Sequence, residues 1–213
     1  MTPKEELVIK FNHIILVQGF SNFSMVDLAK MADISRAKLY IYFKNKDQIV
    51  NSVVDRHLEF LKKYPIPTTA KDENLLSTIL NSLLLLGSTT ELFESELREK
   101  YPQLYRNFKR GYETYFSNLK SYYENAQENH LIIKDISAEF ILFQNRINIR
   151  GILDDVRNNQ LSLNKGEQYL AEYFTYQIHS LLLNKTPIIP DDIKKFSKVI
   201  INEYYDTYAN INH

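Results

Sequence analysis

The amino-acid sequence predicts an all-α protein of about nine or ten helices, and three observations support this prediction. Apolar residues recur at three- and four-residue spacings along most of the chain, which is the pattern of amphipathic helices. Five glycines and six prolines among 213 residues are few for the many turns that a strand-rich fold requires. No stretch reads as a credible strand, an internal repeat or a low-complexity tract.

The first predicted helix covers residues 3–18. Its apolar stripe consists of Leu7, Val8, Phe11, Ile14 and Ile15. Pro3 suits the first helical turn, and Gly19 suits the position just after the last turn. Both ends of this helix therefore carry their own signals.

Two short helices follow, and each has a serine before its first residue. Ser24, with Asp27 three positions later, forms a capping box at the start of a helix over residues 25–32. The letters ADIS then make a tight turn, and Ser35 can cap a helix over residues 36–43. Two short helices joined by a tight turn predict a helix-turn-helix motif.

A fourth helix is predicted over residues 46–63, and the letters YPIPTT at 64–69 end it. Two prolines in three positions prevent a continuous helix there. We therefore predict an N-terminal domain at 1–63 and a larger domain at 64–213. Helices in the larger domain are predicted over 70–86, after an STTE capping box at 88–91, and over 102–128, 136–157, 165–184 and 190–209.

Composition narrows the classes of function. The absence of cysteine excludes disulfides, thiolate zinc sites and thiol nucleophiles. No glycine-rich phosphate loop, nucleophile elbow or zinc signature is present, so we expect neither an enzyme nor a cofactor or metal site. The densest apolar run, SLLLLG at 82–87, is far shorter than the ~18 residues of a membrane span. We expect a cytoplasmic protein.

Charge is unevenly distributed along this chain of zero net charge. Residues 1–64 carry ten Lys and Arg against seven Asp and Glu, whereas the remainder carries sixteen against nineteen. A basic N-terminal part on an acidic body suits nucleic-acid binding, although so small an offset is also ordinary surface chemistry.

The helix at 36–43 has one apolar face and one face suited to a DNA groove. At 100° per residue, Leu39 and Phe43 lie about 40° apart and should point into the protein. Ala37, Lys38 and Ile41 lie on the opposite side. A major groove about 12 Å wide admits one helix, so small or base-reading side chains suit that outward face.

Each outward residue has an expected role. Ala37 allows close approach, Lys38 can donate to guanine and Ile41 can touch thymine methyl groups. Tyrosine hydroxyls and the neighbouring basic side chains can bond phosphates. These expected phosphate contacts are Arg36, Tyr40, Tyr42, Lys44 and Lys46. The alternative is that this short basic helix is only a solvated surface of a protein that does not bind DNA.

Residues 7–55 resemble the N-terminal domain of the TetR/AcrR family of bacterial transcriptional regulators. The matching segment is GFSNFSMVDLAKMADISRAKLYIYFKNKDQIV, with Leu39, Tyr40, Phe43 and Lys46 at the spacing typical of the family. The resemblance implies DNA-contact roles for Ser24, Ser35, Arg36, Ala37, Lys38, Tyr40, Tyr42 and Lys46. The chain departs from the family at Asp33, where glycine is usual in the turn, and at Ala37, where glycine is frequent.

The resemblance also implies that the larger domain forms a homodimer and holds a small-molecule effector. Reading a palindrome requires two recognition helices about 34–36 Å apart, which independently favours a dimer. The predicted dimer helices are those at 136–157 and 165–184. The seam predicted on the second consists of Leu170, Phe174, Ile178, Leu181 and Leu182. These residues could instead be ordinary core within one chain.

Aromatic and amide side chains are the candidates for effector binding. They are Tyr112, Tyr115, Phe116, Phe140, Phe143, Gln144, Asn148 and Tyr176. They suit an apolar pocket with a few polar contacts, although most could simply be core.

The sequence thus predicts a DNA-binding transcriptional regulator, in particular a repressor released from a palindromic operator by an effector. Its expected partners are double-stranded DNA, a second copy of the chain and an unidentified small molecule, with no membrane partner. An activator remains possible, as does an all-helical carrier of apolar ligands or, less favoured, a helical enzyme.

Overall fold

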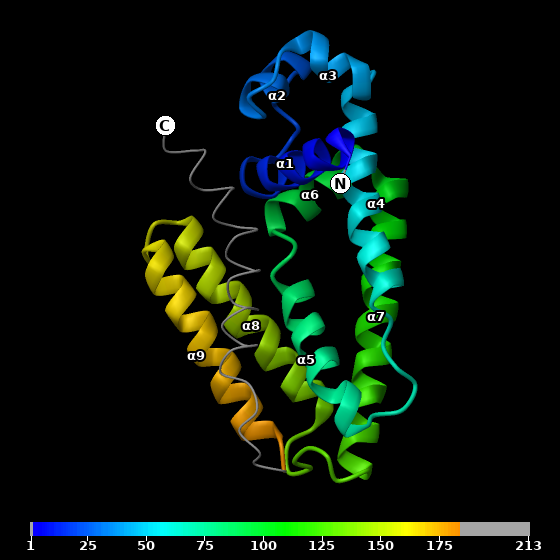
Figure 1. Cartoon of the computed structure of the whole chain (residues 1–213), viewed down its shortest axis with the longest axis vertical. Helices are drawn as coiled ribbons and strands as arrows, with labels where there is room; N and C mark the ends of the chain where they lie inside the picture. Colours follow the sequence, from blue (N-terminus) through cyan, green and yellow to red (C-terminus); the bar gives the residue numbers. More distant parts are fainter. Residues whose placement is uncertain (1, 184–213) are drawn as a thin grey trace. The chain divides into compact units, whose positions relative to one another are not determined.

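The computed structural model describes residues 2–183, and within them the chain forms nine α-helices and no β-strand (Figure 1). The helices are α1 Pro3–Gln18, α2 Met25–Met31, α3 Arg36–Tyr42, α4 Lys46–Lys63, α5 Asp72–Leu86, α6 Glu91–Lys100, α7 Pro102–Glu128, α8 Ala138–Arg157 and α9 Leu163–Leu181. The predicted all-α class is confirmed. The helix predicted over 190–209 lies outside the described residues.

Side-chain caps fix several helix starts. Ser24 accepts a hydrogen bond from the backbone N–H of Asp27, whose carboxylate accepts in return, so the predicted capping box of α2 is confirmed. Ser35 caps α3 in the same way through the N–H of Lys38. The STTE box predicted at 88–91 is wrong. Thr90 caps α6 instead, because the hydroxyl of Ser88 donates to the carbonyl of Leu85 at the end of α5.

The helices divide between two compact units. Unit 1 contains the residues up to Tyr64 together with Thr89–Glu113, which are α1 to α4, α6 and the first part of α7. Unit 2 contains Pro65–Ser88 and the described residues from Thr114 onward, which are α5, the rest of α7, α8 and α9. These units group residues by their packing and not by their order in the chain. The domain boundary predicted at residue 63 therefore stays a prediction.

The core of unit 1 is built around the inner face of α3. Leu39 and Phe43 are fully buried with Leu28 of α2. The ring of Phe43 meets that of Phe11 from α1 edge-on, with 5.8 Å between the ring centroids. α3 is therefore held by its apolar side, and the opposite side faces outward.

A buried polar link joins α1, α4 and α7 inside unit 1. Nε2 of His57 donates to Oδ1 of Asn12 at 2.9 Å, and Nδ1 accepts from the hydroxyl of Tyr112 at 3.1 Å. The ring of His57 also stacks on that of Phe93 from α6, with the centroids 5.8 Å apart. Burial, with a smaller contribution from the charge of Arg56, lowers the pKa of His57 from 6.5 to about 3.

Unit 2 packs α5, the second part of α7, α8 and α9 around a separate apolar core. α8 and α9 are joined by a short link, and a Cβ added to Gly166 would collide with the side chain of Val156. Glycine is therefore needed where the two helices meet.

Among the described residues no single helix is long and apolar enough to cross a membrane; only α5 and α6 taken together would meet that criterion.

We predict that acidification destabilises the chain through His57. Unfolded histidine binds a proton below about pH 6.5, whereas His57 in the folded chain stays neutral down to about pH 3. Its stabilising contribution is thus complete above pH 6.5, and about 2 kcal/mol is lost between pH 7 and pH 5. Urea unfolding at a series of pH values measures this loss. In a His57→Gln variant the decline should be shallower by that amount; an unchanged decline would contradict the assignment.

Candidate nucleic-acid interface

The turn between α2 and α3 adopts the backbone geometry that a helix-turn-helix requires. Asp33 has a φ of +54°, in the left-handed region that aspartate tolerates better than most residues. The N–H of Asp33 donates to the carbonyl of Lys30 at 3.1 Å, and that of Ile34 to the carbonyl of Ala29 at 3.0 Å. Aspartate therefore occupies the position where the family usually has glycine without disrupting the turn.

The outward face of α3 is exposed as expected. Ile41 is 75% exposed and Tyr40 is 41% exposed, whereas Leu39, directly before them, is fully buried. Ala37 and Lys38 are also exposed. One side of α3 thus presents a small, a basic and an apolar side chain together.

Arg36 and Tyr40 form a pair on one flank of α3. The guanidinium of Arg36 lies over the ring of Tyr40, 5.4 Å from its centroid. This cation–π contact orients the guanidinium and leaves its N–H groups available at the surface. On the other flank, Tyr42 is half-buried against the core of unit 1.

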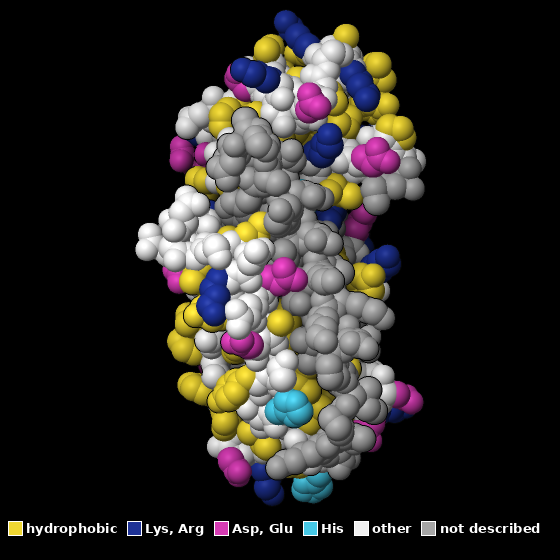
Figure 2. Space-filling model, turned by 60° about the vertical axis from the view of Figure 1, so that its left-hand side comes forward, with side chains coloured by type: hydrophobic (Ala, Val, Ile, Leu, Met, Phe, Trp, Pro, Cys, Tyr) yellow, Lys and Arg dark blue, Asp and Glu magenta, His cyan; other side chains and the backbone are white. Residues whose placement is uncertain are grey.

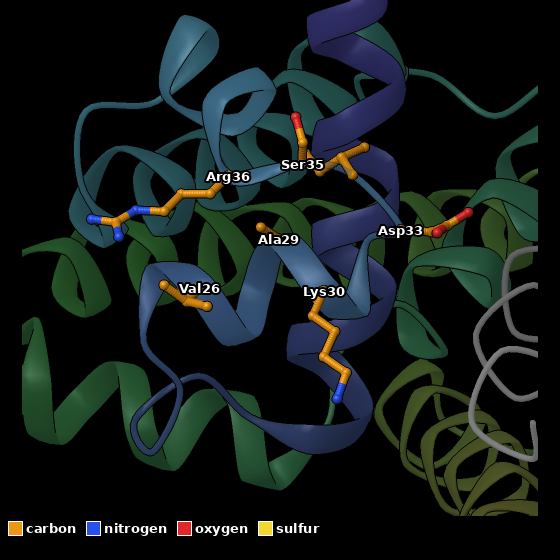
Figure 3. A pocket seen from close by; sticks show the side chains of 7 residues that line it. Val26, Ala29, Lys30, Asp33, Ser35 and Arg36 are labelled. Carbon is orange, nitrogen blue, oxygen red and sulfur yellow. The ribbon is translucent and has the colours of Figure 1, made fainter.

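A groove of about 420 Å³ lies between α2 and α3 (Figure 3). It is lined by Val26, Ala29, Lys30, Asp33, Ile34, Ser35 and Arg36. Figure 3 shows the side chains of Lys30 and Arg36 extending in different directions, and Figure 2 shows basic side chains at the surface of this end of unit 1. Lys30 and the half-exposed Val26 were not predicted from the sequence, because both lie on α2 and a helical wheel of α3 does not include them.

Ser24 is engaged locally. Its hydroxyl donates to Oδ2 of Asp27 at 2.7 Å. This bond, with one from the Ser24 backbone N–H, lowers the pKa of Asp27. A carboxylate therefore stands at the start of α2, and the hydroxyl of Ser24 could only accept, not donate, in a further contact.

Lys46 is placed differently from the surface position expected for a phosphate contact. Its ammonium donates to three backbone carbonyls between α1 and α2, those of Phe20, Ser21 and Phe23, at 3.0, 3.1 and 3.0 Å. All three N–H groups are thus used within unit 1. Lys44, two residues earlier, has an exposed side chain.

The candidate effector residues are divided between the two units. Phe140, Phe143 and Tyr176 are each at least half exposed, and Tyr112 belongs to unit 1, where it bonds His57. The others lie in unit 2, and they are Tyr115, Phe116, Gln144 and Asn148. Of these, Tyr115 is buried and the other three are half-buried.

The predicted dimer seam is buried within a single chain. Leu170, Phe174, Ile178 and Leu181 are at most 5% exposed, and Leu182 packs against the same core. These residues are therefore core, the alternative left open above. The exposed apolar residues of α8 and α9 are instead Phe140, Phe143, Ile147, Tyr169 and Tyr176. Figure 2 shows exposed hydrophobic side chains on the side of the molecule that carries these two helices.

Within residues 2–183 no three histidine or acidic side chains are grouped so that they could hold a metal ion. The candidate surface of unit 1 consists of exposed side chains on α2 and α3.

Comparisons with known proteins agree with this geometry. Residues 14–53 match the family model of the bacterial regulatory proteins, tetR family. An uncharacterized HTH-type transcriptional regulator of Haemophilus influenzae is 26% identical over 163 residues, which cover 75% of each chain. The resemblance stated from the motif is thus confirmed.

Two solved structures share the fold at low sequence identity. The ketosteroid transcriptional regulator KstR2 of Mycobacterium tuberculosis has a TM-score of 0.59 at 13% identity, with 85% of this chain and 95% of that one covered. The SmeT–triclosan complex has a TM-score of 0.53 at 12% identity, with 88% and 96% covered. The chain therefore shares its all-α fold with these two proteins.

We predict that two neighbouring substitutions on α3 differ strongly in their cost to stability. Leu39→Ala should lower the free energy of unfolding by about 2–5 kcal/mol, because it leaves a cavity in the core of unit 1. Ile41→Ala should change it by less than about 0.5 kcal/mol, because that side chain faces solvent. Urea denaturation followed by circular dichroism measures both. Equal costs would mean that the faces of α3 are wrongly assigned.

Proposed function

We propose, from the TetR-family helix-turn-helix domain at residues 14–53, that this chain is a DNA-binding transcriptional regulator. The observation that carries the proposal is the pairing of a buried Leu39 with an exposed Ile41 on α3. This orientation supports insertion of the face with Ala37, Lys38 and Ile41 into a major groove. In finer terms, we propose a repressor that binds a palindromic operator as a homodimer.

The contacts with DNA divide into two classes. Lys38 and Ile41 would read base edges, with Ala37 allowing close approach. Phosphates would be bound on the flanks of α3 and at the ends of the motif, which fixes the register of the protein without reading sequence. The flanking residues proposed for this role are Ser35, Arg36, Tyr40, Tyr42 and Lys44, together with Lys30 in the groove, whereas Ser24 has its hydroxyl proton and N–H engaged by Asp27.

We predict that duplexes selected from a random pool bind with a steep dependence on salt. Lys44→Met should weaken binding to every duplex and reduce the slope of log affinity against log salt by about 0.9, as expected for one lost phosphate contact. Lys38→Met should instead change which duplexes are preferred, by about 1–3 kcal/mol at the contacted base pair. A carrier or an enzyme would show no salt-dependent retention of DNA. Identical behaviour of the two variants would contradict the division into contact classes.

The homodimer part rests on an apolar stripe on α8. Phe140, Phe143 and Ile147 lie at helical spacings on one face, and each is at least half exposed. Gly151 continues this face, and a Cβ added there would meet nothing within 4 Å. With Tyr169 and Tyr176 of α9, the stripe is large for a surface that stays in water. A second copy using the same stripe would form a symmetric four-helix interface.

We predict that Phe143→Asp converts the dimer into a monomer, because a carboxylate at the centre of the stripe would lose its hydration on association. Ser117→Asp, an equally exposed change on α7 of unit 2, serves as the control and should leave the dimer intact. Sedimentation velocity at micromolar concentration distinguishes the two states. A dimer that survives Phe143→Asp would place the interface elsewhere.

The effector part rests on unsatisfied donors in unit 2. The hydroxyl of Tyr115 and Nδ2 of Asn145 are buried without a hydrogen-bond partner. Burial raises the pKa of Tyr115 to about 12, so its hydroxyl keeps its proton. The polar residues described as buried in unit 2 are uncharged, namely Thr78, Ser82, Asn145 and Gln177. An effector bound in unit 2 should therefore be neutral and offer acceptor oxygens.

We predict that a neutral phenolic ether such as triclosan releases the selected duplex from the wild-type chain. The same compound should not release the duplex from the Asn145→Leu variant, and measuring both releases tests the proposal.

A further inference from the structure

The segment between α1 and α2 is held from two sides by charges of opposite sign. On one side, Oε2 of Glu96 from α6 accepts the backbone N–H groups of Phe20 and Ser21 at 2.5 and 3.0 Å. On the other, the ammonium of Lys46 from α4 donates to the carbonyls of Phe20, Ser21 and Phe23. The carboxylate thus binds N–H groups and the ammonium binds carbonyls of the same short segment. We call this arrangement the turn clamp.

Glycine at position 19 makes this approach possible. Gly19 has a φ of +74°, which a residue with a side chain rarely adopts. A Cβ placed there would lie only 2.7 Å from both carboxylate oxygens of Glu96. The turn clamp therefore depends on backbone geometry as well as on the two charged side chains.

α6 makes a second attachment to the same end of α1. The hydroxyl of Thr90, which caps α6, donates to the buried carbonyl of Leu16 at 2.7 Å. The ring of Phe20 also contacts that of Phe93, with 6.5 Å between centroids. Thr90, Phe93 and Glu96 thus fasten α6 along the end of α1 and the start of the clamped segment.

The turn clamp lies at both ends of the helix-turn-helix motif. The clamped segment leads into Ser24, which opens α2, while Lys46 is the first residue of α4, which follows α3. Fixing both ends constrains where α2 and α3 stand within unit 1.

We infer that Glu96 and Lys46 are positioning residues for DNA binding, which act through the turn clamp and do not touch DNA themselves. The inference rests on the proposed function and assigns Lys46 a role different from the phosphate contact that the family resemblance implies. A hydrogen bond to a charged group stabilises a protein more than one between neutral groups. Loss of the charge of Glu96 or Lys46 should therefore displace the helix-turn-helix motif enough to change its affinity for DNA.

Lys46→Met separates the two roles of Lys46. A positioning role predicts an approximately tenfold loss of affinity for the selected duplex, with the salt slope unchanged. A phosphate contact predicts a slope reduced by about 0.9, as for the control variant Lys44→Met. A reduced slope in Lys46→Met would overturn the inference, and so would wild-type affinity.

Glu96→Gln tests the other side of the turn clamp and covers the case in which Lys46→Met does not fold. The amide keeps an acceptor oxygen but no charge, so we expect the same direction of effect, a several-fold loss of affinity at unchanged slope. Binding is measured where circular dichroism reports fully folded protein. A lowered melting temperature with wild-type affinity would mean that the turn clamp is only structural. If the wild-type chain itself fails to retain DNA, the proposed function fails, which is a different result.

Discussion

The burial of Leu39 and Phe43 in unit 1 is the constraint on which the rest of the structure depends. These two side chains leave α3 only one orientation, because their burial against Leu28 and Phe11 is possible on one helical face alone. The exposure of Ile41 and Lys38 is a consequence of that packing. Nothing else in α3 requires these residues to face outward, since a seven-residue helix has little stability of its own.

Polar contacts refine this arrangement without providing its driving force. His57 is kept neutral by burial, and it links α1, α4 and α7 through two hydrogen bonds. The turn clamp uses full charges, and each of them binds backbone groups of the α1–α2 segment. In unit 1 these polar groups are therefore satisfied at places where three elements meet.

Much of the fold could be predicted from the sequence because helix signals are local. The bounds of α1, α4 and α7 match the expected ranges, and Ser24, Ser35 and Asp33 act as their spacing indicated. The outward face of α3 followed from a helical wheel for the same reason. The partners of Lys46 could not be predicted in this way. They are backbone carbonyls more than twenty residues away in the sequence, and a backbone carbonyl leaves no sequence pattern.

The same limit explains the misplaced seam on α9. An apolar stripe shows that one side of a helix is covered, but it does not distinguish a neighbouring helix of the same chain from a second chain. Leu170 and Phe174 meet the core of unit 2, and the residues that remain uncovered on α8 could be identified only from their exposed area. Likewise, the unpartnered Nδ2 of Asn145 has no signature in the sequence, because a lack of partners is a property of three-dimensional packing.

The discontinuous make-up of unit 1 affects how such a protein could be recombined. Phe93, Leu97 and Phe108 are fully buried in the same core as Leu39, although they follow α5 in the chain. A chimera joined after Tyr64 would give these helices a foreign set of neighbours and would separate Gly19 from the carboxylate it accommodates. Exchange of DNA specificity between relatives should therefore tolerate changes on the surface of α3 far better than transplantation of the whole N-terminal segment.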